Sequence, residues 1–453
     1  MRDLVFIAFL GAFLALSLKR PFLFVLVYAY IDIVSPQRLT YYLLNSIPIS
    51  MIAALLAIGG WALMDNKNGS RFSIRQGLIV LLLLYCGMTM TWSAFPIDAK
   101  EKWDWVWKGL AFAAFLPLTL RTKLRIEALI LTMILCAASI IVVGGLKTVA
   151  SGGGGYGVLN LMVDNNSGLY ESSTIAAVAI AIIPLILYLM KHGTIFPPEW
   201  RVTAFGSALI FACLLMPVGT QARTGLICIA LLVVLVLRFN RRRFLWLGLM
   251  GAAGLMAVPL LPTSFTQRMD TIKDYKADES AGTRLAVWAW TWQFAKDHPM
   301  GGGFHSFRAN KIAFNTVKTT ESGGVTNVKS QLETDQGRAF HSAYFEMLGE
   351  QGYPGTALWL LIQGLGLLRM EILRRRYKAT ADPDQQWMAP LAIALQHAQL
   401  IYLVGAVFVG IAFQPFIWML VAIQIGFDTY VGRRAKQARA VPAMGSPRTA
   451  AAH

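Results

Sequence analysis

The chain has 453 residues, of which 56% are hydrophobic and only 14% are charged, and its formal net charge is +17. A soluble domain carries about 25% charged residues, so this composition excludes an ordinary soluble protein. Apolar runs at 77–90, 126–143 and 175–190 are nearly uncharged, and runs of about 17–25 such residues cross a bilayer as helices. We therefore predict an all-α polytopic membrane protein.

The excess positive charge lies in short clusters between the apolar runs. The clusters are Lys67/Arg71/Arg75, Arg121/Lys123/Arg125, Arg238/Arg241/Arg242/Arg243, Arg374/Arg375/Arg376/Lys378 and Arg433/Arg434/Lys436/Arg439. Such clusters mark the cytoplasmic loops of membrane proteins and interact with anionic head groups. They indicate membrane lipids, and not nucleic acid, as partners of the basic residues.

Thirteen apolar segments are expected. They are 3–18, 21–36, 46–64, 77–95, 105–120, 126–147, 172–190, 202–218, 224–238, 244–261, 354–370, 388–410 and 413–431. The first two are short and nearly continuous, so the prediction is twelve or thirteen transmembrane helices. The basic clusters assign the C-terminal tail and five loops to the cytoplasm: 65–76, 121–125, 191–201, 238–243 and 371–387. The same alternation places 37–45, 96–104, 148–171, 217–223 and 262–353 outside.

The outer loop 262–353 is the largest. It contains a tryptophan-rich amphipathic stretch, Thr283–Lys296, that we expect to lie as a helix along the membrane surface, and Gly301–Gly303 then predict a tight turn. Residues 311–338 show little periodicity and are expected to be loop. The predicted domains are N-terminal transmembrane helices at 1–261, the large outer loop with the histidine motif described below at 262–353, C-terminal transmembrane helices at 354–431 and a disordered cytoplasmic tail at 432–453.

His341 is the candidate catalytic residue, because it stands where this polar loop re-enters the membrane. An imidazole with a free pKa of about 6.5 is the usual proton acceptor for a hydroxyl. A histidine that caps a helix or is buried in a hydrogen bond is the structural alternative. Gly352-Tyr353-Pro354-Gly355 predicts a break that would leave a cleft beside His341.

Two arginines are candidates for binding phosphate. Arg223 lies in a short outer turn that positive-inside statistics would leave uncharged, and Arg284 opens the tryptophan-rich helix. Guanidinium groups match phosphate oxygens and stay charged at every working pH, so the pair could hold a pyrophosphate. The alternatives are a snorkelling or structural Arg223, and a surface salt bridge from Arg284 to Asp278 or Glu279.

No metal or cofactor is expected. His298, His305 and His341 do not have the spacing of a compact metal site. The four cysteines lie within apolar runs and are expected to pack there. Gly152–Gly157 lacks the ending of a phosphate-binding loop, whereas Asp164–Ser167 is polar enough to contact a sugar through Asn165.

His341-Ser342, nine residues, Gly352, two residues and Gly355 resemble the His-[Asn/Ser/Gln]-x9-Gly-x-x-Gly pattern of the O-antigen ligase and polymerase superfamily. Over most of residues 1–430 the chain resembles the branch of O-glycosylation ligases associated with exosortase systems. The supporting stretches are Met1-Arg2-Asp3, Lys19–Phe22, Pro36–Thr40, Asp278–Arg284 and Pro299–Phe304.

The resemblance implies a GT-C-like, inverting, metal-independent glycosyltransferase of the bacterial inner membrane. Its donor would be a glycan on undecaprenyl pyrophosphate, and its active site would face the periplasm. His341 would be the base or would orient the acceptor, and Arg223 and Arg284 would contact the pyrophosphate. Gly352 and Gly355 would be structural. Arg308, Gln221, Ser342 and Asn165 are further candidates for substrate binding.

A ligase that joins the glycan to lipid A–core oligosaccharide is the leading interpretation. A polymerase, or a ligase that acts on protein hydroxyls, would share the donor and the motif. A twelve-helix flippase or transporter is disfavoured, because no internal repeat is visible and the polar residues are concentrated in one outer loop.

Overall fold

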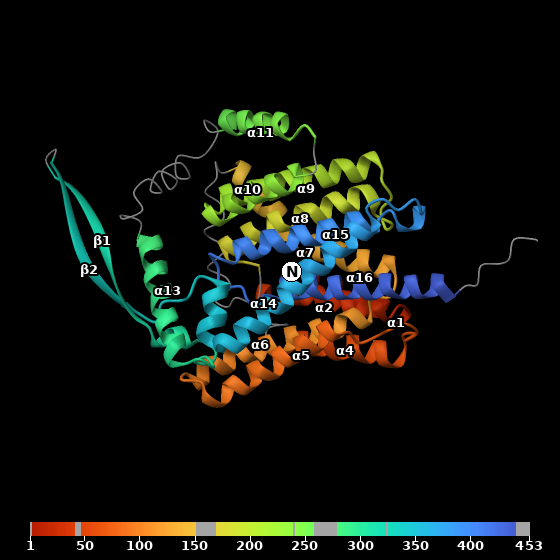
Figure 1. Ribbon diagram of the computed structural model, residues 1–453, viewed down its shortest axis with the longest axis horizontal. Helices are drawn as coiled ribbons and strands as arrows, with labels where there is room; N and C mark the ends of the chain where they lie inside the picture. Colours follow the sequence, from red (N-terminus) through yellow and green to blue (C-terminus); the bar gives the residue numbers. More distant parts are fainter. Residues whose placement is uncertain are drawn as a thin grey trace, which may run out of the picture.

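The computed structural model describes residues 2–40, 47–150, 169–238, 241–257, 279–322 and 325–440. Most of them form a bundle of helices whose axes run along the length of the molecule (Figure 1). The helices of the bundle and its connections are α1 (Arg2–Lys19), α2 (Phe22–Val34), α3 (Pro36–Leu39), α4 (Ile49–Leu63), α5 (Ile74–Thr89), α6 (Pro96–Phe115), α7 (Lys123–Ala150), α8 (Ser172–His192), α9 (Trp200–Gly219), α10 (Arg223–Leu237), α11 (Arg243–Ala257), α14 (Ala343–Tyr377), α15 (Met388–Gly405) and α16 (Pro415–Ala440).

Each of the thirteen predicted segments corresponds to one helix, so 3–18 and 21–36 are separate helices. Among the described residues, seven helices are long and apolar enough to span a membrane: α5, α7, α8, α9, α14, α15 and α16. The shorter apolar helices are α2, α4 and α10. The chain is therefore a polytopic membrane protein, and the count of twelve or thirteen spans stays a prediction.

The structure corrects the predictions for residues 96–104 and 432–440. Residues 96–104, expected as an outer loop, form the first half of α6, because Pro96 occupies the first helical turn, where proline is favoured, and Ala-Lys-Glu-Lys continue it. Helix α16 runs to Ala440, so residues 432–440 are helical although they were expected to be disordered. Residues 441–453 lie outside the described part of the chain.

The large loop contains helix α13 (Glu279–Asp297), which begins before the expected Thr283–Lys296 helix. The prediction of a loop at 311–338 is wrong, because β1 (Lys311–Ser322) and β2 (Val325–Gln336) form an antiparallel hairpin, with Lys311 opposite Gln336. The helical prediction therefore holds for the bundle and fails for this hairpin, which projects from the bundle in Figure 1. Gly-Gly between runs rich in threonine and valine is a hairpin signal that periodicity did not reveal.

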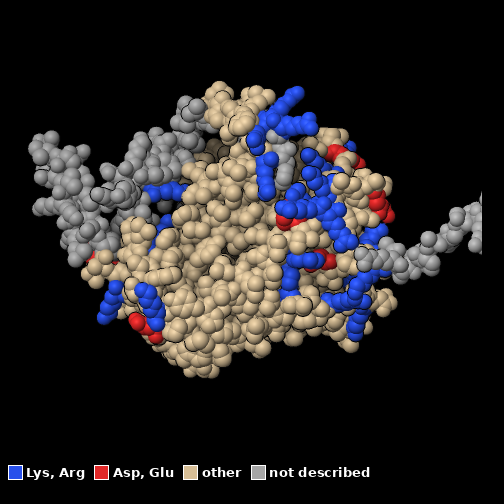
Figure 2. All heavy atoms as spheres, viewed as in Figure 1, with Lys and Arg blue, Asp and Glu red and all other residues tan. Residues whose placement is uncertain are grey.

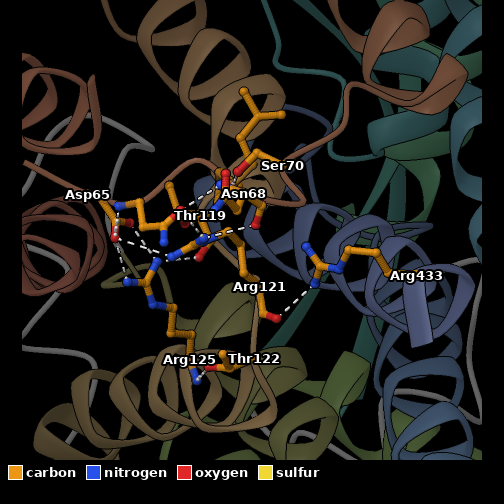
Figure 3. Close-up of polar contacts among 11 residues, drawn as sticks. Asp65, Asn68, Ser70, Thr119, Arg121, Thr122, Arg125 and Arg433 are labelled. Carbon is orange, nitrogen blue, oxygen red and sulfur yellow. Dashed lines mark hydrogen bonds and ion pairs between the residues drawn. The ribbon is translucent and has the colours of Figure 1, made fainter. Parts of the chain in front are cut away.

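The loops predicted to be cytoplasmic meet at one end of the bundle. Arg125 donates to both carboxylate oxygens of Asp65, at 2.6 and 2.8 Å, and Arg433 donates to the carbonyl oxygen of Arg121 at 2.8 Å (Figure 3). Lys123 donates to the carbonyl oxygen of His192 at 3.1 Å. On the face shown in Figure 2, lysines and arginines gather at this end. These loops therefore lie together at one end of the bundle, and their assignment to the cytoplasm stays a prediction.

The predicted outer segments meet at the other end. The first residue of α14, Ala343, donates to Ala406 just after α15, with 2.8 Å between nitrogen and oxygen, and Ala94 before α6 donates to Gly302 at 3.3 Å. The start of α10 packs on the start of α8, since a Cβ at Gly225 would lie 3.1 Å from that of Ala176. This second end carries α13, the hairpin and the candidate site.

Candidate active site

His341 occupies a tight turn immediately before α14. Its backbone is in the left-handed region, with φ of 48°, which is uncommon for a residue other than glycine. Ser342 is the N-cap of α14, although its hydroxyl makes no capping hydrogen bond. His341 is accessible to solvent as a residue, although the surrounding protein desolvates its ring enough to lower its pKa. No described residue hydrogen-bonds its imidazole. Neither structural alternative, a capping or a buried bonded histidine, describes this residue.

Helix α13 holds the turn from one side. The indole Nε1 of Trp288 donates to the carbonyl oxygen of Phe340 at 2.9 Å, and the Trp288 ring stacks on Phe345 with centroids 5.0 Å apart. Val287, Phe340 and Ile312 form a small buried cluster between α13, the turn and the hairpin. Rigid elements thus fix the residue that precedes His341.

The predicted break in α14 is at Gly352, where φ is 61° and ψ is −165°. The segment from Pro299 to Gly303 passes beside this break. The amides of Gly302 and Gly303 donate to the carbonyls of Gly349 and Glu350 at 2.9 and 3.0 Å, and Tyr353 donates to Pro299 at 2.9 Å. These bonds partly satisfy backbone groups that a kinked helix would leave free.

The two motif glycines are required by close packing. A Cβ on Gly352 would overlap the carbonyl oxygen of Pro299, and one on Gly355 would lie 3.1 Å from the ring of Tyr85. Tyr85 in turn donates its hydroxyl to Met300 at 2.9 Å. The structural role expected for both glycines therefore follows from the crossing of this loop and α14.

His341 lines a cavity of about 330 Å³. Its polar lining residues are Glu101, Lys102, Glu171, His305, His341, Glu346, Glu350 and Gln414, and aromatic walls come from Trp105, Phe307, Phe340 and Phe413. The cavity is within the range of about 300–1,000 Å³ typical of small-molecule sites, near its lower limit. Its walls come from α6, the start of α8, the large loop, α14 and the segment after α15.

A buried ion cluster forms one wall of the cavity. Lys102 Nζ donates to Glu346 at 2.5 Å and to the two oxygens of Glu350 at 2.8 and 2.7 Å. Glu350 also accepts from the amide of His305 at 3.0 Å, and Glu346 accepts from that of Ala412 at 3.1 Å. Burial of charges is tolerated when they are paired and bonded in this way. The cluster thus connects α6, α14 and the loops on both sides of the cavity.

This cluster was not among the predicted site residues. Glu346 and Glu350 stand inside the motif at helical i, i+4 spacing, so the two carboxylates lie on one face of α14. Their cation, Lys102, was placed in a loop that is in fact helix α6. Two acidic residues on one face of an apolar helix were the available signal, since such residues face a partner or a cavity.

The surroundings keep the cavity histidines neutral at pH 7. The pKa of His341 is lowered, chiefly by desolvation and also by the positive charges of Arg284 and Arg338, while Glu171 acts in the opposite direction. Desolvation and the charges of Lys102 and Arg308 lower the pKa of His305 to about 4. A neutral imidazole can accept a proton, as a general base must.

The two predicted arginines have different relations to His341. Arg284 lies one turn before Trp288 on α13 and acts electrostatically on His341. Arg223 begins α10 at the same end of the bundle, where Cys228 of that helix contacts Ile401 of α15. Neither arginine lines the cavity. The structure thus places Arg284 within electrostatic range of His341 and places Arg223 at the start of α10; the binding role of both arginines stays a prediction.

The remaining candidates are placed as follows. Arg308 forms an ion pair with Asp98 at 3.0 Å, between the large loop and α6. Gln221 is in a left-handed turn, with φ of 52°, before α10. The Ser342 hydroxyl is buried and has no hydrogen-bond partner among the described residues. Asn165 lies outside the described residues.

The described residues contain no group of three or more histidine, cysteine or acidic side chains that could hold a metal ion. His298 stacks on Phe294 with centroids 4.2 Å apart and is exposed, whereas His305 and His341 line the cavity. The four cysteines are free and buried, which confirms that they pack in the interior.

Two stretches of the chain match known families. Residues 1–194 match a family of unknown function (DUF5935), and residues 208–360 match the O-antigen ligase family. No curated protein matches the chain. The second match contains Arg223, Arg284, His341 and Gly352, and it supports placing the chain in the O-antigen ligase superfamily.

Proposed function

We propose that this protein is an O-antigen ligase-type glycosyltransferase. It transfers a glycan from undecaprenyl pyrophosphate to a hydroxyl of lipid A–core oligosaccharide, with inversion and without a metal ion. The site faces the periplasm of a bacterial inner membrane, and the fold is of the GT-C type. We also place the chain in the exosortase-associated branch.

One observation carries the proposal. His341, inside the part of the chain that matches O-antigen ligase, is exposed to a cavity and has the positive charge of Arg284 beside it. Positive charge beside a neutral imidazole suits a reaction in which a hydroxyl loses a proton and an anionic group leaves.

The chemistry assigned to each residue follows from its charge. His341 accepts the proton of the acceptor hydroxyl while the hydroxyl oxygen forms a bond to the anomeric carbon. The bond between that carbon and the pyrophosphate oxygen breaks, and the electron pair leaves with the pyrophosphate. Arg284 and Arg223 stabilise the departing charge. A positioned base contributes about 10²–10⁴-fold to such a rate.

Ligation is tested with purified protein in liposomes that contain a fluorescent glycan on undecaprenyl pyrophosphate. Lipid A–core, a free glycan and a hydroxyl-bearing peptide are supplied in parallel as acceptors. The proposal predicts product on lipid A–core and its loss in His341→Ala. His298→Ala is the matched control, because His298 belongs to the same loop and is exposed.

Each outcome identifies an activity. Product on the free glycan alone would identify a polymerase, and product on the peptide alone would identify a protein O-glycosylation ligase. Movement of the donor across the bilayer without any transfer would identify a flippase. Full transfer by a folded His341→Ala protein would refute the catalytic assignment.

A further inference from the structure

The N-terminal part of the chain, which matches a family of unknown function, builds one wall of the His341 cavity. Glu101 and Trp105 lie one turn apart on α6 and both line the cavity, and Glu171 does so from the start of α8. The opposite wall, with His305 and His341, belongs to the part that matches O-antigen ligase. A ligand in the cavity would therefore touch both parts.

The charge of the cavity is negative. Its lining residues include four glutamates, Glu101, Glu171, Glu346 and Glu350, but only one lysine and no arginine among the described residues. Lys102 is bonded to Glu346 and Glu350, so it cannot offset all of the acidic charge. Arg38 acts electrostatically on Glu101, and Arg284, Arg338 and Arg308 act on the cavity histidines, but none of these arginines lines the cavity. Walls of one charge sign concentrate ligands of the opposite sign and repel those of the same sign.

The hydrogen-bonding groups of the cavity suit hydroxyls. Carboxylates accept hydrogen bonds and cannot donate them. Glu171 is held in place by accepting from the amides of Ser173 and Thr174 at 3.1 and 2.6 Å. His305 Nδ1 is buried without a hydrogen-bond partner among the described residues, and the His305 ring is neutral at pH 7 because its pKa is lowered to about 4. A hydroxyl can donate to the carboxylates and bond with this imidazole.

An aromatic wall completes the match to a sugar. Trp105 is partly exposed and lies one turn after Glu101 on α6. An indole presents an apolar face together with a polar edge. The C–H groups of a sugar ring can pack on such a face while the sugar hydroxyls bond with neighbouring polar groups. Lys102 is the one basic residue among the described lining residues, and it is already bonded to Glu346 and Glu350. A phosphate-binding site would instead direct an arginine or lysine at the ligand, and both predicted pyrophosphate arginines lie outside the lining.

We propose that this cavity is an acceptor-sugar subsite that takes a neutral or amino sugar ring and excludes rings that carry a carboxylate or phosphate, with its recognition wall supplied by the N-terminal part of the chain. The term acceptor rests on the proposed function, whereas sugar binding and charge selectivity do not. The pyrophosphate of the donor is assigned to Arg284 and Arg223, which do not line the cavity, and not to this subsite.

Binding is measured without donor, by saturation-transfer NMR on the full-length protein in nanodiscs at pH 7.5. The probes are methyl β-glucoside, methyl β-glucosaminide and methyl β-glucuronide, which share one ring and differ in charge. We expect the dissociation constants of the first two to be at least about tenfold lower than that of the glucuronide. A tenfold ratio corresponds to a difference of about 1.4 kcal/mol in binding free energy. Equal or tighter binding of the glucuronide, or no binding of any probe, would overturn the proposal.

Two variants assign the binding to this cavity. Glu101→Gln should reduce the difference in affinity between the glucoside and the glucuronide, because it removes one negative charge that repels the glucuronide. Trp105→Ala should weaken the binding of all three probes. The matched controls are Glu199→Gln and Trp200→Ala, whose side chains are exposed at the other end of the bundle. Equal effects of the cavity variants and their controls would contradict the assignment.

The proposed ligase function and the proposed sugar subsite can be refuted independently of each other. Charge-selective binding by a protein that transfers no glycan would refute the ligase and keep the sugar subsite. Glycan transfer that depends on His341, together with unselective binding, would refute the subsite and keep the ligase.

Discussion

The indole Nε1 of Trp288 donates a hydrogen bond of 2.9 Å to the carbonyl oxygen of Phe340, the residue immediately before His341. This bond ties helix α13 to the turn that carries the imidazole. Because α13 also carries Arg284, one helix both positions His341 and sets its electrostatic surroundings.

Trp288→Phe should lower the turnover of glycan transfer about 3–10-fold with little effect on folding. Phenylalanine can keep the stacking on Phe345 but loses the bond to Phe340, and such a bond contributes about 0.5–1.5 kcal/mol. Steady-state transfer rates check this. Trp292→Phe is the control, since Trp292 is on the same helix and is 51% exposed; an equal loss there would argue against the positioning role.

Gly352→Ala should destabilise the protein strongly. The φ of 61° at this position costs a residue other than glycine about 1–3 kcal/mol, and the methyl group would also overlap the carbonyl of Pro299. Gly364→Ala, in the same helix with nothing near its added Cβ, should instead stabilise by up to about 1 kcal/mol. Thermal unfolding in detergent compares the two, and similar midpoints would show that the break is not required.

Lys102→Met should destabilise the protein by about 3–5 kcal/mol, because it leaves Glu346 and Glu350 buried without their cation. Combining it with Glu346→Gln and Glu350→Gln should restore much of the stability, since no buried charge then remains. Lys100→Met, at an exposed position of the same helix, is the control. The cluster would not be a stabilising ion network if the triple variant were no more stable than Lys102→Met.

The acid limb of the transfer rate should move to higher pH in Arg284→Met. The positive charge of Arg284 disfavours the imidazolium form and so lowers the pKa of His341; its removal raises that pKa, and protonation then inactivates the base at a higher pH. Profiles of kcat/KM against pH measure the shift. Arg375→Met, at an exposed residue near the other end of α14, should leave the acid limb unchanged, and a shift in both variants would point to a global effect.

Lys318→Cys in strand β1 should react with an impermeant maleimide from the periplasmic side, and Lys436→Cys in α16 should react only from the cytoplasmic side. The four native cysteines are free and buried, so the wild-type protein provides the background. Labelling of both introduced cysteines from the same side would refute the topology.

The sequence by itself determined the helical bundle and the motif. Each apolar segment became one helix because apolar length is a local property that does not depend on neighbours. The break at Gly352 was also predictable, since glycine and proline punctuate a helix locally. His341 was predictable for the same reason, as the one titratable group of the motif that stands where the polar loop ends.

Tertiary structure decided what surrounds His341. Lys102 bonds with Glu346 and Glu350 although more than 240 positions separate them along the chain, and no local pattern encodes such a pairing. The same holds for the N-terminal residues Glu101 and Glu171 in the cavity wall. The hairpin at Lys311–Gln336 depends on pairing between backbone groups of two strands, and the hydrophobic periodicity of a single segment does not reveal such pairing. Contacts between distant segments, rather than residue types, therefore fixed the shape and charge of the site.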